Sequence, residues 1–527
     1  MEKGELIKLA NKFYTEEEVA RLEAAVDFAS EKHEGQLRKS GEPYITHPLK
    51  VAGILIEWGM DADTIIAGVL HDVVEDTETP LDEIEATFGE DIAFLVDGVT
   101  KVGKARSGMN NLETYLPQTK DNLSKLLIAV GQDVRVVIIK LADRLHNVQT
   151  LEHMSPEKQK KIARETLDVF ARIADRLGMG RVRMTMEETA FSYLNPSEYK
   201  RLSNEIRKRL GKSTRKLGRV REEVESELKK AGIDFEISGR VKSVYSLHKK
   251  LKKTKGDIDR VYDLMALRII VKNKDDCYRV LGILHSIYKP MIERIKDYIS
   301  MPKPNGYQSL HTTVITPSKL IAEFQIRTEE MHEFAERGLA ASFHYHEQKS
   351  SGAYLSGATS RERIPQAGRP ETKGNGGLSN ELQWIVQLQD VAQRLRDGEE
   401  IDPEQLQIDI FGDRIFVYSP KGDIYNLPEG ALPLDFAYMV HSDVGKHAYA
   451  FRVNEKIHAF DKPLEEGDVV EVITRKTSLP KVDWLDLVKT SHARVKLRAQ
   501  LRNAGLLGRI SNTAAAQAQR LRDKFGK

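Results

Sequence analysis

Cysteine is nearly absent from this chain, which has a single one, Cys277, among 527 residues. One thiol forms neither an internal disulfide nor a cysteine-based zinc site, so a bound metal would need His, Asp or Glu ligands. The chain also lacks an apolar run of the roughly 20 residues that cross a membrane. Its first residues, MEKGE, lack the apolar core of a signal peptide. We therefore expect a cytoplasmic protein without a membrane span.

An overall excess of one charge is missing too, because 81 Lys and Arg face 79 Asp and Glu. This balance hides two basic blocks. Residues 200–260 hold 20 Lys and Arg against 9 acidic residues, and residues 475–527 hold 13 against 3. A solvated helix face is the ordinary explanation of such a run. The alternatives are polyphosphate binding by the first block and nucleic-acid binding by the second.

Length and periodicity divide the chain. At about 150 residues per domain, we expect three or four domains, each with its own core. Residues 1–200 place apolar residues at helical spacing, for example over 19–29 and 49–56, which predicts an all-α domain. Residues 201–348 combine a basic helix with β-rich runs, which predicts an α/β domain; these runs are 267–271 and 323–327.

The rest of the chain is less regular. Residues 349–402 begin with a stretch rich in Gly and Ser and end with a helical pattern at 382–395, so we expect a flexible linker plus a helix. Short β runs separated by turns predict a compact β-grasp domain over residues 403–476; the runs are 408–410, 415–418, 451–453 and 469–473. Residues 477–527 are basic and helical, as the start of a further helical domain would be.

Polar side chains interrupt apolar helical patterns at two places in the first region. The first group follows the apolar run 65–70 and would share one side of a continuous helix: His71, Asp72, Glu75 and Asp76. The second group follows apolar residues at 136–141 and is spaced i, i+4: Asp143 and Asn147. Buried carboxylates and imidazoles are too costly without a compensating cation. Both places therefore indicate a bound metal.

Together with His47, these groups predict a metal centre without thiol ligands. Two imidazoles and two carboxylates suit a borderline-hard divalent ion such as Mn²⁺ with an open position for water. The metal would lower the pKa of that water, and Glu75 or Asp76 could accept its proton. This is the chemistry of metal-assisted phosphoester hydrolysis. The alternative is that each histidine is an ordinary hydrogen-bonded core residue.

One strand predicts a phosphate-transfer site in the second region. Glu323, Gln325 and Arg327 alternate with apolar residues, so they share one strand face. Asp263 precedes the run 267–271 and would hold Mg²⁺ on a triphosphate with Glu323 if the two strands are neighbours. Phosphoryl-type transfer needs mainly positioning and charge neutralisation. The chain has no Walker A loop, which excludes ordinary P-loop NTPases.

Three motifs in the first region resemble one family: His47-Pro, the segment 67–77 (AGVLHDVVEDT) and the segment 140–147 (KLADRLHN). They resemble the HD-type hydrolase domain of the long RelA/SpoT homologues, which make and destroy the stringent-response alarmones ppGpp and pppGpp. The resemblance implies four Mn²⁺ ligands and two catalytic carboxylates; the ligands are His47, His71, Asp72 and Asp143, and the carboxylates are Glu75 and Asp76. It also implies that the guanine nucleotide meets Arg38, Lys39 and Asn147.

The resemblance continues in the second region. The segment 294–311 (RIKDYISMPKPNGYQSLH) resembles the synthetase signature loop, in the Arg-x-Lys-Asp version typical of bifunctional members. It implies a nucleotidyltransferase-like domain that moves the β,γ-pyrophosphate of ATP to the 3′-hydroxyl of GTP or GDP. In this reaction Glu323 would activate the hydroxyl, Asp263 would bind Mg²⁺ and Tyr307 would stack on guanine. The resemblance implies seven further nucleotide-binding residues, of which six are Arg, Lys or His and one is Asn: Arg240, Lys242, Lys250, Lys296, Lys303, His311 and Asn305.

One segment departs from the family pattern. Where the family usually has Ala-Ala-His-Trp, a variable residue and Tyr-Lys, this chain has Ala340-Ala-Ser-Phe-His-Tyr-His346. The lost Trp and Lys put the C-terminal edge of the synthetase, and its rate, in question. The acidic pair of Asp263 and Glu323 is intact.

The C-terminal part resembles the TGS domain of the same family, in the segments 420–423, 434–441 and 464–472. By that match His441 would contact uncharged tRNA on the ribosome. The zinc-finger and ACT regions that follow in the family are not in this sequence. We expect a bifunctional alarmone synthetase and hydrolase. Two alternatives stay open: an enzyme with hydrolase activity only, and a catalytically silent regulator that binds the ribosome or tRNA.

Overall fold

The computed structural model describes residues 1–104, 133–253, 257, 265–303, 305–338, 340 and 414–503. The chain divides into two compact units, residues 1–398 and residues 399–527. Several predicted features lie outside the described residues; these are Asp263, the altered segment at 341–346, the linker, the helix at 382–395, the strand at 408–410 and the end of the chain after 503. No helix that the structure describes is both long and apolar enough to span a membrane.

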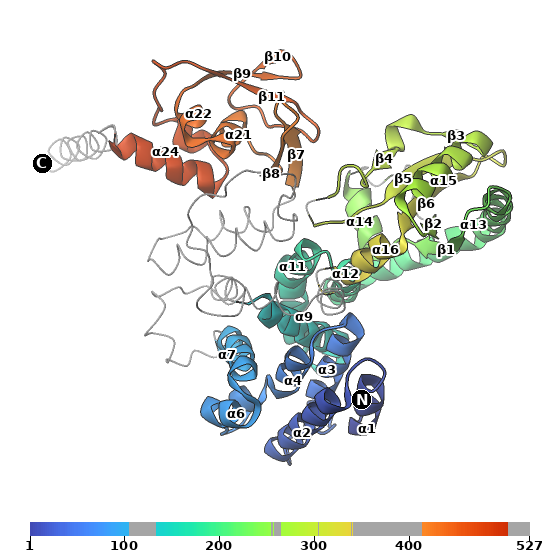
Figure 1. Ribbon diagram of the computed structural model, residues 1–527, viewed down its shortest axis with the longest axis vertical. Coiled ribbons are helices and arrows are strands. Elements are labelled where there is room, and N and C mark those ends of the chain that lie inside the picture. Colours follow the sequence, from blue (N-terminus) through green and yellow to red (C-terminus); the bar gives the residue numbers. More distant parts are fainter. Residues whose placement is uncertain are drawn as a thin grey trace, which may run out of the picture. The chain divides into compact units, whose positions relative to one another are not determined.

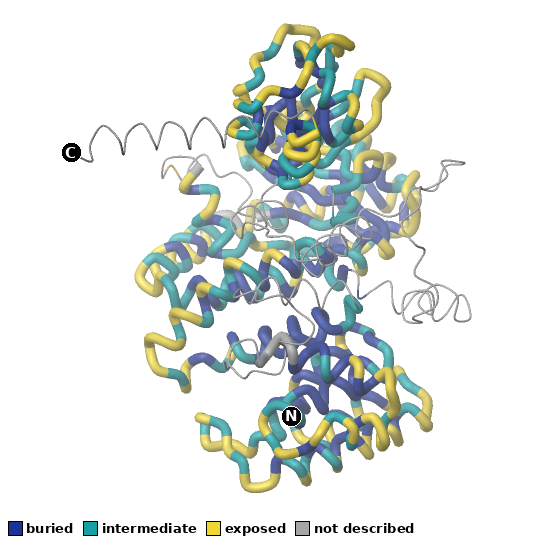
Figure 2. Tube along the Cα trace, turned by 90° about the vertical axis from the view of Figure 1, so that its left-hand side faces the viewer, coloured by how far each residue is buried: buried dark blue, intermediate teal, exposed yellow. Residues whose placement is uncertain are grey.

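The N-terminal part of the first unit is all α, as predicted (Figure 1). Its helices are α1 (Lys3–Ala10), α2 (Glu16–Lys32), α3 (Thr46–Trp58), α4 (Ala62–Leu70), α5 (Val73–Asp76), α6 (Leu81–Phe88), α7 (Glu90–Lys104), α9 (Val134–Gln149), η1 (Leu151–His153), α10 (Pro156–Glu165), the π-helix η2 (Thr166–Phe170), α11 (Ala171–Arg176) and α12 (Gly180–Leu194). The helices predicted over 19–29 and 49–56 are α2 and α3. Buried residues gather inside this bundle (Figure 2).

A helix of 35 residues, α13 (Pro196–Lys230), leads from the bundle into the α/β part. The domain boundary predicted at residue 200 therefore falls inside a continuous helix. The first half of α13 packs with α14 (Val244–Lys253) through Leu202, Ile206 and Leu247. Its second half packs under the sheet through Val220, Val224 and Leu228.

The α/β part is a mixed sheet in the order β1-β2-β6-β5-β3, with β4 paired to β5. The strands are β1 (Phe235–Val241), β2 (Met265–Val271), β3 (Lys289–Pro290), β4 (Lys296–Asp297), β5 (Leu310–Ile315) and β6 (Ile321–Thr328), and the remaining helices are α15 (Lys274–Ile287), η4 (Ile292–Arg294) and α16 (Glu329–Arg337). Strands β2 and β6 are parallel neighbours, with Ala266 opposite Glu323. The neighbouring strands that the sequence-based Mg²⁺ prediction required are thus present.

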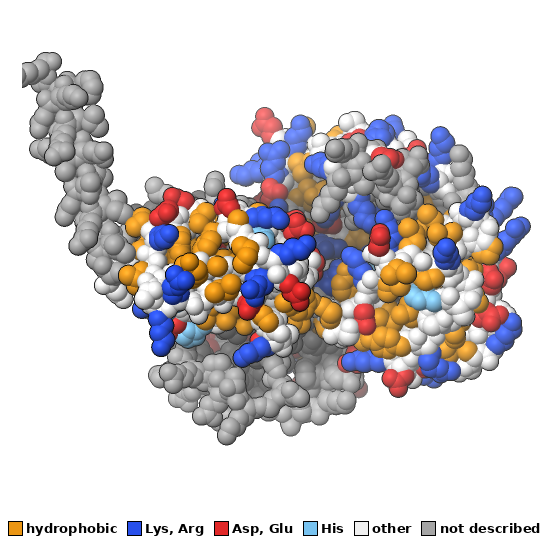
Figure 3. Space-filling model, turned by 90° about the horizontal axis from the view of Figure 1, so that it is seen from above, with side chains coloured by type: hydrophobic (Ala, Val, Ile, Leu, Met, Phe, Trp, Pro, Cys, Tyr) orange, Lys and Arg blue, Asp and Glu red, His pale blue; other side chains and the backbone are white. Residues whose placement is uncertain are grey.

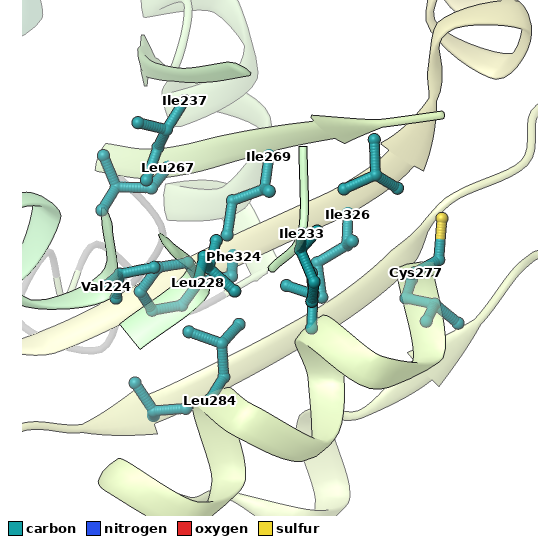
Figure 4. Close-up of a cluster of buried hydrophobic side chains, with 14 of the residues drawn as sticks. Val224, Leu228, Ile233, Ile237, Leu267, Ile269, Cys277, Leu284, Phe324 and Ile326 are labelled. Carbon is teal, nitrogen blue, oxygen red and sulfur yellow. The ribbon is translucent and has the colours of Figure 1, made fainter. Parts of the chain in front are cut away.

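One face of this sheet is apolar and packs on α15 and α13. Phe324 and Ile326 on β6 are fully buried there, together with Leu267 and Ile269 on β2 (Figure 4). Cys277 on α15 belongs to the same core. Burial raises the pKa of its thiol to about 12, so this cysteine is a packing residue rather than a reactive one. The opposite face of the sheet is left for polar side chains.

The second unit is built around α21 (Pro433–Val440). Its other elements are β7 (Arg414–Tyr418), β8 (Ile424–Pro428), α22 (Ser442–Lys446), β9 (Ala448–Val453), β10 (Lys456–His458), β11 (Val470–Thr474), α23 (Trp484–Leu487) and α24 (Ser491–Asn503). The predicted strands at 415–418, 451–453 and 469–473 are confirmed as β7, β9 and β11. Figure 3 shows apolar side chains gathered on one face of this unit, beside Lys and Arg.

Candidate metal centre and nucleotide site

Three helices bring the predicted metal ligands together. His47 lies in the first turn of α3, His71 directly follows α4, and Asp143 lies on α9. All three residues are buried, and each offers a ligand atom within 4.8 Å of the others. Asp72 adds a second carboxylate, with Oδ1 3.2 Å from Nε2 of His71 and Oδ2 3.5 Å from Nε2 of His47.

The tautomer of His71 is fixed by its backbone neighbour. Its Nδ1 lies 2.7 Å from the carbonyl oxygen of Gly68, which can only accept a hydrogen bond, so Nδ1 carries a proton and donates. In the neutral ring, Nε2 is then a bare lone pair. This atom is buried and has no hydrogen-bond partner. A donor to a carbonyl on one side and a free nitrogen on the other is the usual arrangement of a metal-binding imidazole.

His47 is oriented by His146 and Arg38. Nδ1 of His47 lies 2.7 Å from Nδ1 of His146, and a guanidinium nitrogen of Arg38 lies 3.3 Å from the same His146 atom. Arginine only donates, so Nδ1 of His146 is the acceptor and His47 donates to it. Burial is the largest of the causes that lower the pKa of His146 to about 3, which keeps it neutral. Nε2 of His47 is therefore also a lone pair, 3.2 Å from Oδ1 of Asp143.

Two bare imidazole nitrogens and two carboxylates thus converge, and neither imidazole nitrogen has a proton to donate to a carboxylate. Lone pairs that face carboxylates at these distances repel one another unless a cation lies between them. Without one, a proton would take its place: burial lowers the pKa of His71, but the Asp72 charge raises it more, to about 9. The donor set fits a divalent metal of the kind that binds imidazole and carboxylate together.

The predicted continuous helix through residues 71 to 76 is wrong. Helix α4 ends at Leu70, and the short α5 begins at Val73. The break lets His71 point into the core while Glu75 stays half-buried and Asp76 exposed. The pairing of Asp72 with Asp76 survives because the N–H of Asp76 still donates to the carbonyl of Asp72, at 2.8 Å.

Tyr44 joins these two carboxylates. Its hydroxyl lies 2.8 Å from Oδ2 of Asp72 and 2.5 Å from Oδ2 of Asp76. Its ring stacks on His33 at 4.7 Å between centroids. Burial, and then the nearby carboxylate charges, raise the pKa of Tyr44, so it remains a hydroxyl donor. Burial also raises the pKa of Glu75, which favours its role as a proton acceptor near neutral pH.

Two further residues on α9 support Asp143. Lys140 is buried and lies 2.9 Å from Oδ2 of Asp143. Burial lowers the pKa of Lys140, but the Asp143 and Asp72 charges raise it more, so it stays cationic. The amide of Asn147 donates to Oδ1 of Asp143, as their i, i+4 spacing predicted. Arg38 reaches Asn147 at 3.4 Å, whereas Lys39 is exposed beside it.

The polar face of the sheet carries the second predicted site. Glu323, Gln325 and Arg327 share this face, and in the register of the sheet Arg268 lies opposite Gln325, as does His311 on the other side. The predicted alternation is confirmed, but the face is more enclosed than the sequence suggested. Arg327 is 1% exposed, and burial lowers its pKa to about 10.

A chain of polar contacts crosses this face. The hydroxyl of Tyr307 lies 2.9 Å from Nε2 of His311, and Nδ1 of His311 lies 3.5 Å from Oε1 of Glu323. The amide of Gln325 donates to the same Glu323 oxygen at 3.1 Å, and Arg240 donates to Gln325 at 3.0 Å. Burial lowers the pKa of His311, so the ring is neutral at neutral pH. A carboxylate beside a neutral imidazole can accept the proton of an attacking hydroxyl.

The loop before β5 is tied to the helical bundle. Nδ2 of Asn305 donates to the carbonyl of Asp175 on α11 at 3.0 Å, a contact between residues 130 positions apart. Lys303 lies over the rings of Tyr298 and Tyr307, and burial lowers its pKa. Of the other predicted nucleotide residues, Lys296 pairs with His311 across β4 and β5, Lys242 follows β1 and Lys250 lies on α14.

Comparisons with known proteins agree with this division. An HD domain model matches residues 25–180, the region found in RelA / SpoT proteins matches residues 239–350, and a TGS domain model matches residues 415–474. The chain is 41% identical to a guanosine-3′,5′-bis(diphosphate) 3′-pyrophosphohydrolase of Aquifex aeolicus, over 96% of the chain and 68% of that protein. It belongs to the RelA/SpoT family.

Two other relatives carry different names within this family. A GTP pyrophosphokinase of Myxococcus xanthus is 41% identical over 93% of the chain and 61% of its own length. The bifunctional (p)ppGpp synthase/hydrolase SpoT of Escherichia coli is 39% identical over 94% of the chain and 67% of its own length. The chain thus spans about 60% of the length of the Myxococcus protein.

In the TGS domain, His441 sits at the start of α22. Its Nδ1 accepts a hydrogen bond from the N–H of Asp443 at 3.2 Å, and its side chain is 66% exposed. The imidazole thus caps a short helix and still reaches solvent.

Four contributors to these sites were missed in the sequence: Tyr44, Lys140, His146 and Asp175. His146 and Lys140 lie three residues on either side of Asp143, one helical turn away, so their spacing was a usable signal. Tyr44 precedes His47 by three residues but carries no such signal, because it lies before the start of α3. Asp175 carries none, because its partner is 130 residues away.

Proposed function

We propose that this chain is a bifunctional alarmone enzyme of the stringent response, acting in the cytoplasm. One domain hydrolyses the 3′-pyrophosphate of (p)ppGpp, and the other transfers pyrophosphate from ATP to the 3′-hydroxyl of GTP or GDP. The observation that carries the hydrolase half is the convergence of two bare imidazole nitrogens on two carboxylates. The synthetase half is supported by the contact chain from Tyr307 to Glu323 and by the similarity to the Myxococcus GTP pyrophosphokinase.

In the hydrolase site, His47, His71, Asp72 and Asp143 would hold Mn²⁺, which when bound supplies a Lewis acid and an activated water. Glu75, whose pKa burial raises, accepts the water proton. Asp76, an exposed carboxylate that accepts a hydrogen bond from Tyr44, is the second candidate acceptor, and the proton taken from the water passes to the leaving 3′-oxygen. Arg38, beside Asn147, faces the guanosine part of the substrate.

In the synthetase site, Glu323 accepts the proton of the 3′-hydroxyl as the oxygen attacks the β-phosphorus of ATP, and the bond from this phosphorus to the α,β-bridging oxygen breaks to release AMP. Tyr307 stacks on the acceptor guanine, and six further residues bind the two nucleotides: Arg240, Lys242, Lys250, Lys296, Lys303 and His311. Asn305, which donates a hydrogen bond to Asp175, belongs to the acceptor site on the strength of the sequence motif. The Mg²⁺ ligand Asp263 belongs to the same proposal on the strength of the sequence motif.

Alternative functions are separated by one set of assays. Purified chain is given ppGpp with Mn²⁺, and separately ATP and GDP with Mg²⁺. Product in both reactions supports the bifunctional enzyme, and product with ppGpp alone supports a hydrolase. No product in either reaction favours a silent regulator that binds uncharged tRNA and the ribosome through His441 and the basic C-terminal block.

A further inference from the structure

The middle of α13 carries charge of one sign only. Between Glu205 and Glu222 the helix has eight Lys and Arg and no acidic residue. Neither proposed activity uses this stretch, because every residue assigned to the two sites lies elsewhere. Lys and Arg side chains project widely from the first unit, as Figure 3 shows for one face.

Four of these cations share one side of the helix. Lys208, Arg215 and Arg219 are spaced by seven and four residues, close to two turns and one turn, and Lys216 borders the same side. All four side chains are exposed. We call these four residues the basic face of α13.

The opposite side of α13 holds its packing residues. Ile206 and Leu210 lie in the cluster around α14, and Leu217 and Val220 lie in the cluster under the sheet. The helix is thus anchored at both ends of the basic stretch and bridges the gap between two cores. The basic face points away from both anchors, since the two sets of residues lie half a turn apart.

Two glycines flank the basic face. A Cβ atom added to Gly211 or Gly218 would meet nothing within 4 Å. Glycine inside a helix costs about 1 kcal/mol relative to alanine. Their open flanks leave room for a bulky chain along the helix.

Ion pairs are unevenly distributed along α13. Its ends have close pairs, such as Arg201 with Glu198 at 2.7 Å and Arg221 with Glu225 at 2.7 Å. Within the described residues, no ion pair involves a member of the basic face. Self-repulsion along this face is therefore uncompensated within the part of the chain that is described.

We propose that the basic face of α13 binds the phosphate backbone of a nucleic acid, independently of its sequence. From Lys208 to Arg219 the face spans 11 residues, or about 16 Å at 1.5 Å per residue. A straight row of cations matches a polymer of phosphates, whereas a free nucleotide needs convergent groups in a concave site. The face has no aromatic, Asn or Gln side chain to stack on or read bases, so the contacts are to phosphate alone.

The test compares two variants of the full chain that lose the same charge. The first is Lys208→Gln, Arg215→Gln, Lys216→Gln and Arg219→Gln. The matched control replaces four cations at the ends of the same helix: Arg201→Gln, Arg221→Gln, Lys229→Gln and Lys230→Gln. Binding of a fluorescent single-stranded RNA of about 16 nucleotides is measured by anisotropy over a range of salt concentrations. Circular dichroism checks that both variants keep their helix content.

The basic-face variant should bind the RNA about tenfold more weakly, and its slope of log K against log salt should fall by about 3, since each lost phosphate contact contributes about 0.7. The control should change affinity less than about twofold. Equal losses in both variants would overturn the proposal, because net charge alone would then explain binding. Absence of RNA binding by the wild-type chain would overturn it as well.

Two more measurements identify the site and the ligand. Photo-crosslinked RNA should map to peptides of α13; crosslinks confined to the basic residues after 475 would refute the site. Polyglutamate at equal charge should compete poorly; if it displaces the RNA completely, the face binds acidic polypeptide and the nucleic-acid assignment is wrong. Neither readout uses an enzymatic activity, so a failure of the proposed function leaves this test intact.

Discussion

Nδ1 of His146 lies 2.7 Å from Nδ1 of His47 and accepts a hydrogen bond from it. This contact turns Nε2 of His47 toward Asp143 and fixes the ring as a ligand. Partners of this kind outside the ligand set are worth about 10- to 100-fold in metal affinity when removed. His146 is therefore as much a part of the proposed metal centre as His47, the proposed ligand that it orients.

The variant His146→Phe should keep the ring stacking on His47 but remove the acceptor. We expect Mn²⁺ affinity to fall about 10- to 100-fold, measured by calorimetric titration of the chelator-treated chain. Excess Mn²⁺ should restore ppGpp hydrolysis, because the four ligands are intact. His153→Phe, at a partly exposed position, serves as the control. An unchanged Mn²⁺ affinity in His146→Phe would show that His47 does not depend on this contact.

Removal of a ligand should silence one activity only. In Asp72→Asn the amide keeps the shape but loses the charge that balances the cation, so ppGpp hydrolysis should disappear. His71→Ala should behave alike. Transfer of pyrophosphate from ATP to GDP should persist, since Glu323 lies in a different domain. Both reactions are followed by separation of the nucleotides; undiminished hydrolysis by chelator-treated wild-type chain would refute the metal assignment.

The variant Glu323→Gln should lose pyrophosphate transfer while ATP and GDP still bind. An amide cannot accept the hydroxyl proton, and loss of a general base typically costs about 10²- to 10⁴-fold in rate. Glu329→Gln, an exposed position at the start of α16, makes the same chemical change outside the site. The measurement is turnover at saturating ATP and GDP. A normal rate in Glu323→Gln would mean that another group takes the proton.

Tyr307 should act through its ring rather than its hydroxyl. In Tyr307→Ala the stacking surface is gone, so the KM for GDP should rise. In Tyr307→Phe the contact with His311 is lost but the ring remains, and the KM for GDP should stay within about threefold of the wild-type value. Initial rates over a GDP series distinguish the two variants. Equal KM values in both would indicate that the hydroxyl, and not stacking, holds the guanine.

Local patterns predicted what a single element determines. The alternation of Glu323 and Gln325 with apolar residues set the two faces of β6, because side chains of a strand alternate by backbone geometry. The i, i+4 spacing placed Asp143 and Asn147 on one helix face, where their side chains form a hydrogen bond, and this too follows from backbone geometry. Residues 71 and 72 were misjudged because nothing in the local pattern marks a helix break. The break is determined by tertiary packing, in which His71 enters the core while α5 stays near the surface.

Contacts between distant segments could not be predicted in this way. Asn305 was assigned to nucleotide binding by its motif. The sequence around Asn305 and the sequence around Asp175 do not predict that these two residues are in contact. The same holds for Arg38 and His146, which are 108 residues apart. The motif identified the participants, but only the packing of α3, α9 and α11 determines which of them touch.

A physical connection runs from the metal centre to the loop that holds Tyr307. Arg144, the residue after Asp143, is buried, pairs with Glu165 at 3.2 Å and lies 4.2 Å from the ring centroid of Phe170. Phe170 ends the π-helix η2, which continues into α11 and so to Asp175. Short π-helical segments often occur at functional sites. The segment 162–174, which lies between the two predicted sites in the sequence, contains this π-helix.

If the two sites are coupled, the coupling in binding is reciprocal and typically amounts to about 1 to 3 kcal/mol, or roughly 5- to 150-fold. A nonhydrolysable guanosine ligand in the hydrolase pocket should then lower the affinity of the synthetase site for ATP. Bound ATP should lower the affinity of the hydrolase pocket for the guanosine ligand by the same factor. Calorimetric titrations in both orders measure it, in a Tyr307→Ala background that keeps the guanosine ligand out of the synthetase site. Equal affinities with the other site empty or filled would rule out antagonism at the level of binding.

The variant Gly338→Ala should abolish this coupling by separating the helical bundle from α16. Gly338 has φ +61°, and an added Cβ would lie 2.2 Å from the carbonyl oxygen of Leu177 and 2.5 Å from the carbonyl carbon of Gly178. Both are backbone atoms, which cannot move aside as the end of a flexible side chain can. Gly232→Ala is the control, because Gly232 has nearly the same φ, +68°, but open space around its Cβ. Gly338 also has ψ −138°, close to a backbone region that is essentially restricted to glycine, so Gly338→Ala combines backbone strain with the forced separation, whereas Gly232→Ala controls for positive φ alone. Coupling should therefore fall below about twofold in Gly338→Ala and stay at the wild-type value in Gly232→Ala; equal coupling in the two variants would show that the signal does not pass through this contact.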